Sequence, residues 1–479
     1  MSTMIAPSAF RVRVARAGDF LRDHQQAIQR MQWGIVVVYA ALLVVPAVLP
    51  LPDRTASVFN NLSIVAQFAF WGIWWPFVLL SIPLFGRAWC GLFCPEGALT
   101  EWASRHGRGG AIPRWMRWGG WPFVAFALTT VYGQLVSVYQ YPWAVAAVLG
   151  GSTVAAIIVG WLYGKEKRVW CKYLCPVNGV FHLLAKLSPW HYRVDAEAWR
   201  TSLRRTEAIN CAPLLPLRTM QGAAECHMCG RCSDYRGAIA LSPRSPEVEI
   251  VDVAGGNAWQ TVLIVFGLMG LAVGAFLWSA SPWYVSIKQA IATWLVNHDV
   301  YWPLADNAPW FILTHYPQVN DSFSWLDGAV ILLFVGATAL VVGGAVFVGL
   351  WLADSVLPAM RRPGLKDVKD ATAGERLRRG FDGVHNLAQG LIPAAGAGVF
   401  LGLSATTLTL LQHEGLPVGW ANPARFVLLA LALAWSLRFQ WRLAGLRTLN
   451  AWHRGAAVVL VALGLLPFVC SWVLFFVVW

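Results

Sequence analysis

Long apolar runs separated by short, basic loops dominate the chain. A run of about 18 or more apolar residues is long enough to cross a bilayer as a helix. Nine runs are predicted to do so, at about residues 31–51, 63–86, 119–138, 142–163, 258–280, 328–353, 386–411, 425–440 and 456–478. The pattern therefore predicts an all-α polytopic membrane protein with about nine transmembrane helices.

Basic residues are concentrated in alternate loops, and this bias predicts the orientation of the chain. Arginines cluster before the first run, between the second and third runs, and in the loop 361–380. Short loops rich in Lys and Arg stay on the cytoplasmic side of a membrane. We therefore expect a multi-pass protein of the bacterial inner (cytoplasmic) membrane.

Four segments follow from the same pattern. They are a cytoplasmic N-terminal segment 1–30, a four-helix membrane half 31–189, a polar cytoplasmic domain 190–256, and a C-terminal membrane half 257–479 that contains an external segment 281–327. The composition agrees with a membrane protein. Charged residues make up 13% of the chain, whereas soluble domains contain about 25%.

The net charge of +13 raises the question of a nucleic-acid partner. The basic residues sit in short loops between apolar runs, where their usual roles are topology and contact with anionic lipid. Membrane lipid is therefore an expected partner, and nucleic acid is not.

Two matched cysteine motifs follow apolar runs in the first membrane half. "WCGLFCPEG" covers Trp89–Gly97 and "WCKYLCPVN" covers Trp170–Asn178. Bacterial ferredoxins end their iron–sulfur motif with the same Cys-x-x-x-Cys-Pro spacing. Two such pairs supply four thiolates, which is enough for one four-iron cluster. These ligand candidates are Cys90, Cys94, Cys171 and Cys175. By the charge bias, both motifs lie at the cytoplasmic face.

A third cysteine group lies in the polar stretch 190–256. Cys226, Cys229 and Cys232 have the spacing of the first part of a ferredoxin motif, but the expected fourth position is occupied by Arg236. Cys211 is the available replacement. Eight cysteines thus suit two [4Fe–4S] clusters as iron ligands, and the sequence leaves open which four bind which cluster. The predicted fold class gains a small cytoplasmic ferredoxin-like iron–sulfur segment.

Disulfide bonds and a zinc site are alternative roles for the grouped cysteines. Disulfides conflict with a reducing cytoplasm. A structural zinc site could use the third group, with His227 as a further ligand. Cys470 stands alone in the last apolar run, where a packed small apolar side chain is the ordinary interpretation.

At "WCGLFCPEGALTEW", "WCKYLCPVNGVFHLL" and "CHMCGRC" the chain resembles the membrane polyferredoxins. These include the membrane subunit of periplasmic nitrate reductase systems (NapH type), the nitrous oxide reductase accessory flavoprotein (NosR type) and the copper-reducing oxidase assembly factor (CcoG type). The resemblance covers roughly residues 60–250 and implies one-electron transfer by four-iron clusters. It assigns cluster roles to all the grouped cysteines except Cys211. It leaves the apolar runs after 257 unexplained.

The predicted function is membrane-bound iron–sulfur electron transfer, in the oxidoreductase class and with no catalytic residue of the chain's own. Electrons would pass between quinol or a cytoplasmic donor and a redox partner protein or subunit of a respiratory chain. A copper or metal reductase for oxidase assembly is one alternative, and a zinc-binding membrane scaffold or transporter is another. The absence of Cys-x-x-Cys-His disfavours c-type haem. Quinone, flavin and haem b remain open as further cofactors.

Overall fold

The structure is a computed structural model that describes residues 9–53, 56–204, 206–253, 255–358 and 381–478. It divides into two compact units, and each is assembled from three stretches of the chain. Unit 1 comprises Met1–Val45, Phe77–Pro122 and Gly150–Ala254, and unit 2 comprises Pro46–Pro76, Phe123–Leu149 and Gly255–Trp479. All eight grouped cysteines belong to unit 1. The basic loop 361–380 lies outside the described residues.

Seven helices of the described chain are long and apolar enough to cross a membrane, and a pair bent by 42° would make an eighth. The seven are Gln25–Val48 (α2), Leu62–Phe85 (α3, η1, α4), Pro142–Leu162 (α8, η3, α9), Ala258–Ala280 (α13, η7, α14, η8), Trp325–Val356 (α16), Ile392–His413 (α19) and Ala421–Gly445 (α20). The bent pair is Ala451–Gly464 (α21) and Leu466–Val477 (α22). The multi-pass helical prediction is confirmed at this level.

The count of about nine spans is higher than the structure supports, because one predicted span is short. The run at 119–138 forms α7, Trp121–Leu135, which has 15 residues. At about 1.5 Å per residue such a helix is roughly 22 Å long, whereas the hydrocarbon core is about 30 Å thick.

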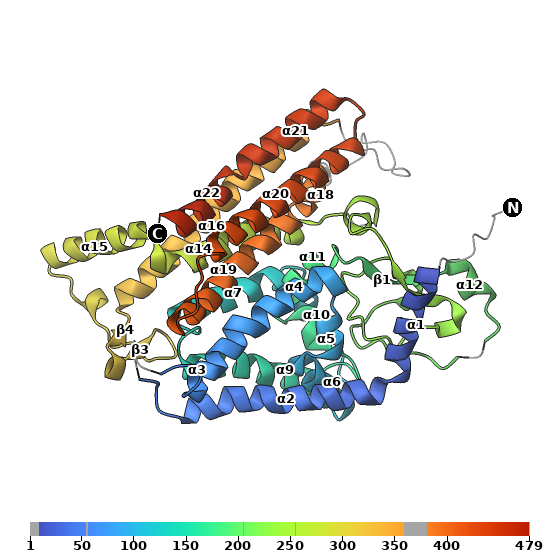
Figure 1. Ribbon diagram of the computed structural model, residues 1–479, viewed down its shortest axis with the longest axis horizontal. Helices are drawn as coiled ribbons and strands as arrows, with labels where there is room; N and C mark the ends of the chain where they lie inside the picture. Colours follow the sequence, from blue (N-terminus) through green and yellow to red (C-terminus); the bar gives the residue numbers. More distant parts are fainter. Residues whose placement is uncertain (1–8, 54–55, 205, 254, 359–380, 479) are drawn as a thin grey trace. The chain divides into compact units, whose positions relative to one another are not determined.

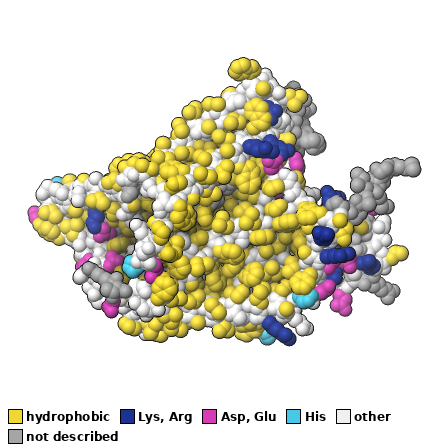
Figure 2. All heavy atoms as spheres, viewed as in Figure 1, with side chains coloured by type: hydrophobic (Ala, Val, Ile, Leu, Met, Phe, Trp, Pro, Cys, Tyr) yellow, Lys and Arg dark blue, Asp and Glu magenta, His cyan; other side chains and the backbone are white. Residues whose placement is uncertain are grey.

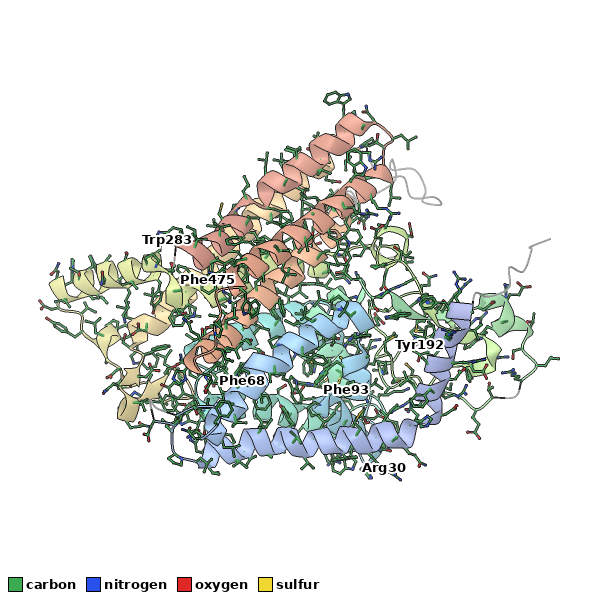
Figure 3. The ribbon with its side chains drawn as sticks, viewed as in Figure 1. Arg30, Phe68, Phe93, Tyr192, Trp283 and Phe475 are labelled. Carbon is green, nitrogen blue, oxygen red and sulfur yellow. The ribbon has the colours of Figure 1, made fainter. Side chains whose placement is uncertain are left out.

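Unit 1 joins membrane helices to a set of short elements around the cysteines (Figure 1). The short elements are α1 (Ala9–Asp23), α5 (Ala88–Leu92), α6 (Pro95–Arg105), η2 (Trp115–Arg117), α10 (Val169–Tyr173), α11 (Asn178–Ala185), β1 (Trp190–Val194), α12 (Ala196–Thr201), η4 (Leu217–Thr219), η5 (Tyr235–Gly237), β2 (Ile239–Pro243) and η6 (Glu249–Val253). β1 and β2 pair antiparallel, with Trp190 opposite Pro243. Figure 3 labels Tyr192, a buried residue of β1, and Phe93, which follows α5.

The helix after the first cysteine motif packs closely on a membrane helix of the same unit. On α9, a Cβ added at Gly160 would lie 2.4 Å from the carbonyl oxygen of Thr100 on α6. Only glycine permits this approach, so α6 is held against the bilayer-spanning part of unit 1. The first motif is therefore built on a rigid support.

Unit 2 is a helix bundle whose contacts also depend on small residues. On α16, a Cβ added at Gly349 would lie 2.9 Å from the Cα of Gly464 on α21. Lipid supplies no hydrophobic drive for association, so close backbone approach is how membrane helices gain contact. The remaining elements are α15 (Pro282–Asn297), η9 (Trp302–Leu304), β3 (His315–Tyr316), η10 (Pro317–Val319), β4 (Asp321–Ser322) and α18 (Asp382–Gln389).

Large apolar side chains remain exposed on the membrane helices. On α2, Val37 and Val44 are 66% and 59% exposed, as expected for side chains that face lipid. Figure 2 shows hydrophobic side chains over the helices in this view, with Lys and Arg side chains near α1. Cys470 on α22 is also exposed, so it is not packed against other described residues as a small apolar side chain, and its place on an outer helix face suits lipid contact.

Candidate functional site

The two Cys-Pro motifs adopt the same local structure. Each begins with a five-residue helix, α5 or α10, and the chain then turns at the residue before the second cysteine. The backbone N–H of Cys94 donates to the carbonyl of Trp89 at 2.9 Å, and that of Cys175 donates to the carbonyl of Trp170 at 3.0 Å. The sequence repeat is thus a structural repeat, and it presents the two cysteines of each motif in the same way.

The structure brings the two motifs together into one group of four thiols. In this first thiol group, Cys94 interacts electrostatically with Cys90 and Cys171, and Cys175 interacts with Cys94 and Cys171. Cys90 and Cys171 are buried, and the other two are partly buried. The cysteines of the two motifs, which are 77 or more residues apart in the sequence, therefore meet at one place.

The third cysteine cluster forms a second group, and it includes Cys211. One cavity is lined by all four members of this second thiol group, Cys211, Cys226, Cys229 and Cys232. Cys232 interacts electrostatically with the other three. Arg236 occupies the position where a ferredoxin would have its fourth cysteine. Its guanidinium stacks on the Trp199 ring, 5.6 Å from the ring centre.

The loops that carry the two groups touch through one glycine. A Cβ added at Gly91, between the cysteines of the first motif, would lie 2.0 Å from the carbonyl oxygen of His227. The side-chain amide of Gln32 donates to the carbonyl of Gly91 at 2.8 Å, and that of Gln25 donates to the carbonyl of Cys229 at 2.8 Å. Helix α2 thus holds one loop from each group.

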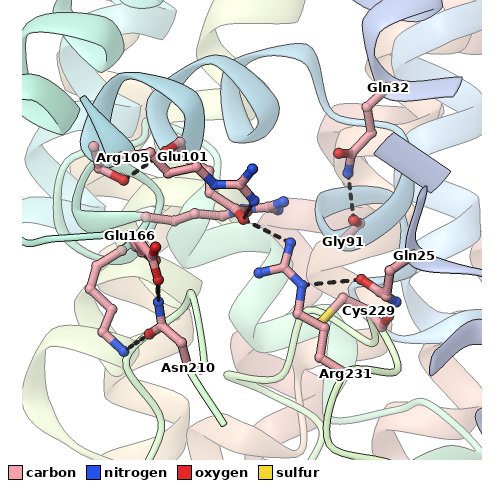
Figure 4. A network of polar contacts seen from close by, with 12 residues as sticks. Gln25, Gln32, Gly91, Glu101, Arg105, Glu166, Asn210, Cys229 and Arg231 are labelled. Carbon is pink, nitrogen blue, oxygen red and sulfur yellow. Dashed lines mark hydrogen bonds and ion pairs between the residues drawn. The ribbon is translucent and has the colours of Figure 1, made fainter. Parts of the chain in front are cut away.

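Glu101 on α6 joins all three cysteine motifs through arginines (Figure 4). Its carboxylate accepts from Arg168 at 2.8 Å and from Arg231 at 2.7 Å. It also pairs with Arg105 one turn along α6, at 2.8 Å. Arg168 precedes the second motif, and Arg231 lies between Cys229 and Cys232. Burial opposes the charge of Glu101, but Arg168 and Arg231 outweigh it and lower its pKa to about 2.

Comparison with known proteins matches the regions that hold the two Cys-Pro motifs. A family of 4Fe-4S binding domains matches at residues 67–113 and 146–194. Each matched segment contains one of the two Cys-Pro motifs. It is also 22% identical over 242 residues to the protein called "Putative electron transport protein YccM" in Escherichia coli (strain K12), covering 45% of this chain and 67% of that one. No solved structure matches the chain.

These matches confirm the resemblance to membrane polyferredoxins. The 4Fe-4S domain covers both motifs of the first thiol group, whereas the second thiol group lies beyond the matched residues. An iron–sulfur electron-transfer role is thus supported for the chain. The number of clusters and the identity of the cysteines that bind them remain predictions.

The chemistry of the thiols suits iron–sulfur clusters. Burial raises the pKa of Cys171 to about 12, and burial likewise raises that of Cys226 to about 12. Such thiols lose their protons only when a strong positive charge binds them, as a metal centre does. Among the described residues, no three His, Cys, Asp or Glu side chains converge as ligands of a single metal ion. Four-iron clusters are larger and need their ligands further apart.

Sequence reasoning missed the residues that surround the thiols. Glu101 is 4% exposed and ion-paired, and its local sequence gives no sign of either property. Arg87 and Arg168 each stand three residues before the first cysteine of a motif. The shared pattern Arg-x-Trp-Cys in both repeats was the signal that could have identified them.

Unit 2 contains a separate cavity of about 250 Å³. Its wall includes Trp143, Trp310, His315 and Tyr316, with Leu49 among the apolar residues that follow α2. His315 Nδ1 and the Tyr316 hydroxyl are both buried, and neither has a hydrogen-bond partner among the described residues.

The aromatic walls of this cavity are ordered by ring contacts. The Tyr316 ring stacks on Tyr141 with centroids 3.7 Å apart, and Trp143 lies 5.9 Å from Trp310. Burial, followed by Asp321, raises the pKa of Tyr316 to about 12. Its hydroxyl therefore stays protonated at neutral pH.

Proposed function

We propose that the protein is a membrane-bound electron carrier with two [4Fe–4S] clusters, one at each thiol group. Each cluster would use all four thiols of its group as iron ligands and would carry one electron at a time. The observation that carries this proposal is the division of eight cysteines into two groups of four. The chain itself buries the sites, holds their loops together and supplies nearby charge.

The clusters would pass electrons between quinol or a cytoplasmic donor and a partner redox protein. The unit 2 cavity is the candidate quinol site, because it has aromatic walls and two buried polar atoms that have no hydrogen-bond partner among the described residues. Quinol oxidation releases two electrons and two protons, so one quinol could reduce both clusters. A copper or metal reductase would share the clusters and differ in its acceptor.

The proposed site faces the cytoplasm of a bacterial cell at the inner membrane, as part of a respiratory chain. Support comes from the basic residues around it. Lys167 donates to the carbonyl of Cys211 at 3.2 Å, and Lys172 donates to the carbonyl of Leu214 at 3.0 Å. Positive residues of this kind mark the cytoplasmic ends of membrane helices.

Anaerobically purified full-length protein tests the carrier function. The protein would be reduced with dithionite, freed of excess reductant and titrated with decylubiquinone while EPR follows the reduced clusters. We expect about two electrons per chain to leave the clusters, one from each. Reduced clusters that persist at excess quinone would contradict the quinone route. A chain with zinc and no sulfide would instead favour the scaffold or transporter.

Tyr316→Phe tests the cavity as the quinone site. Loss of one hydrogen bond of about 1.4 kcal/mol should raise the quinone concentration for half-maximal reoxidation by roughly tenfold. His298→Ala is the matched control, because His298 is exposed in the same segment and does not line the cavity. Equal quinone dependence in the wild type and Tyr316→Phe would place quinone elsewhere.

A further inference from the structure

Two arginines hold equivalent positions in the repeat and are both buried. Arg87 precedes α5 and Arg168 precedes α10, and each is the N-terminal cap residue of its helix. Arg87 is 4% exposed and Arg168 is 2% exposed. Burying a charged side chain is unfavourable unless nearby groups compensate it. The burial of a positive charge at both equivalent positions indicates that these charges have a role in the folded protein.

Arg168 connects the first thiol group to the second. Its Nη1 donates to the carbonyl oxygen of Cys90 at 2.5 Å, in the first group. Its backbone N–H donates to the carbonyl of Ala212 at 2.8 Å, next to Cys211 in the second group. Its positive charge acts on the thiols of both Cys171 and Cys229. One guanidinium therefore faces a thiol of each group.

Arg87 has the same relation to the two groups from the other motif. Its Nη2 donates to the side-chain oxygen of Asn178 at 2.8 Å, three residues after Cys175. Its Nη1 donates to the carbonyl of Ala224 at 3.4 Å, two residues before Cys226. The charge of Arg87 acts on the thiols of Cys171 and Cys226.

The two arginines differ in their negative partner. Glu101 forms an ion pair with Arg168 at 2.8 Å. Arg87 has no carboxylate partner among the described residues, and its Nε is buried without a hydrogen bond. The charge of Arg168 is thus partly neutralised by a carboxylate, whereas that of Arg87 is balanced by neutral oxygens alone.

We propose that Arg87 and Arg168 are a shared pair of cations that raise the reduction potentials of both cluster sites, and that Glu101 limits the contribution of Arg168. This inference rests on the proposed function. Reduction adds one negative charge to a four-iron cluster, so a fixed positive charge nearby favours the reduced form. The effect is large because the site is buried and its effective dielectric constant is low.

A purely structural role for the arginines makes a different prediction. If they only hold loops, removing Arg168 and removing Glu101 should disturb the same contact and have the same kind of effect. If they act by charge, the two substitutions should shift the potentials in opposite directions. The sign of the shift therefore separates the two explanations.

EPR-monitored redox titration of the full-length protein tests the proposal. Arg87→Gln and Arg168→Gln should each shift both cluster signals to more negative potentials. Glu101→Gln should shift both signals to more positive potentials, and Arg168→Lys should stay close to the wild type because it keeps the charge. Arg204→Gln is the control, since Arg204 is 63% exposed and pairs with Asp234.

The proposal is overturned if Arg168→Gln shifts one signal only, or if Glu101→Gln shifts the potentials in the same direction as Arg168→Gln. Where the two arginine-to-glutamine variants assemble no clusters, a positive shift of both signals in Glu101→Gln supports the proposal, and a negative shift or no shift contradicts it. Iron and sulfide in the wild type are determined first. Their absence would defeat the proposed function itself, which is a separate result from unshifted potentials in a loaded protein.

Discussion

The two thiol groups of unit 1 are built in different ways. The first uses the same turn twice, with a short helix before each Cys-Pro step. The second uses an irregular loop in which Met228, Gly230 and Asp234 have positive φ angles. A repeated turn can position four thiols by symmetry. The irregular loop needs outside supports, which the chain supplies from α2 and Glu101.

The first prediction distinguishes the two thiol groups by removing one thiol at a time from the first thiol group. Cys94→Ser and Cys175→Ser should each lose the same EPR signal, because their thiols share one group. Iron should fall from about eight to about four per chain, with the second cluster retained. Full iron content in either variant would contradict ligation shared between the motifs.

Cys211→Ser tests the member of the second group that lies outside the ferredoxin spacing. Its loss leaves three thiols around the cavity, so we expect a changed or absent second signal and an intact first signal. Iron analysis and EPR on the same sample measure both. Cys470→Ser is the control, because Cys470 is exposed on α22. An unchanged second signal in Cys211→Ser would remove Cys211 from the ligand set.

Gly91→Ala tests the contact between the two groups. The added methyl would meet the carbonyl oxygen of His227 at 2.0 Å, and overpacking of this kind costs about 1–3 kcal/mol. We expect a lower thermal midpoint and faster loss of both clusters. Gly34→Ala on α2 is matched to it, because nothing lies within 4 Å of the added atom. Equal stability of the two variants would argue against a tight contact.

Gln25→Ala should have the smallest effect and act on the second group alone. It removes the hydrogen bond to the carbonyl of Cys229 and the acceptor for Arg231 at 3.1 Å. A loss of about 1 kcal/mol is expected, seen as faster release of iron from the second cluster during mild denaturation. The exposed neighbour in Gln26→Ala should behave as the wild type. Faster loss from the first cluster instead would contradict this assignment.

Local patterns predicted most of the membrane helices, whereas the cluster ligands assigned from the cysteine spacing stay a prediction. Apolar length sufficed for the spans, although α7 is too short to be one of them. The two copies of Cys-x-x-x-Cys-Pro are recognisable in the sequence because spacing and proline act within a few residues, and the structure shows that they form equivalent turns. Cys211 was found by elimination, and its place in the cavity with the other three supports that choice.

Contacts between distant residues could not be predicted from one sequence. Glu101 is 67 residues from Arg168 and 130 from Arg231, and no local pattern reports which charged groups meet after folding. The approach of Gly91 to His227 likewise depends on tertiary packing. The unit 2 cavity joins the end of α2 to residues near 143 and 310–318, which come from both predicted membrane halves.

Iron and acid-labile sulfide per chain, determined on anaerobically purified wild type and Cys175→Ser, test the central claim most directly. The account predicts about eight irons and eight sulfides in the wild type and about four of each in the variant. Four or fewer irons in the wild type, or the same content in both proteins, would contradict two separate four-thiol cluster sites.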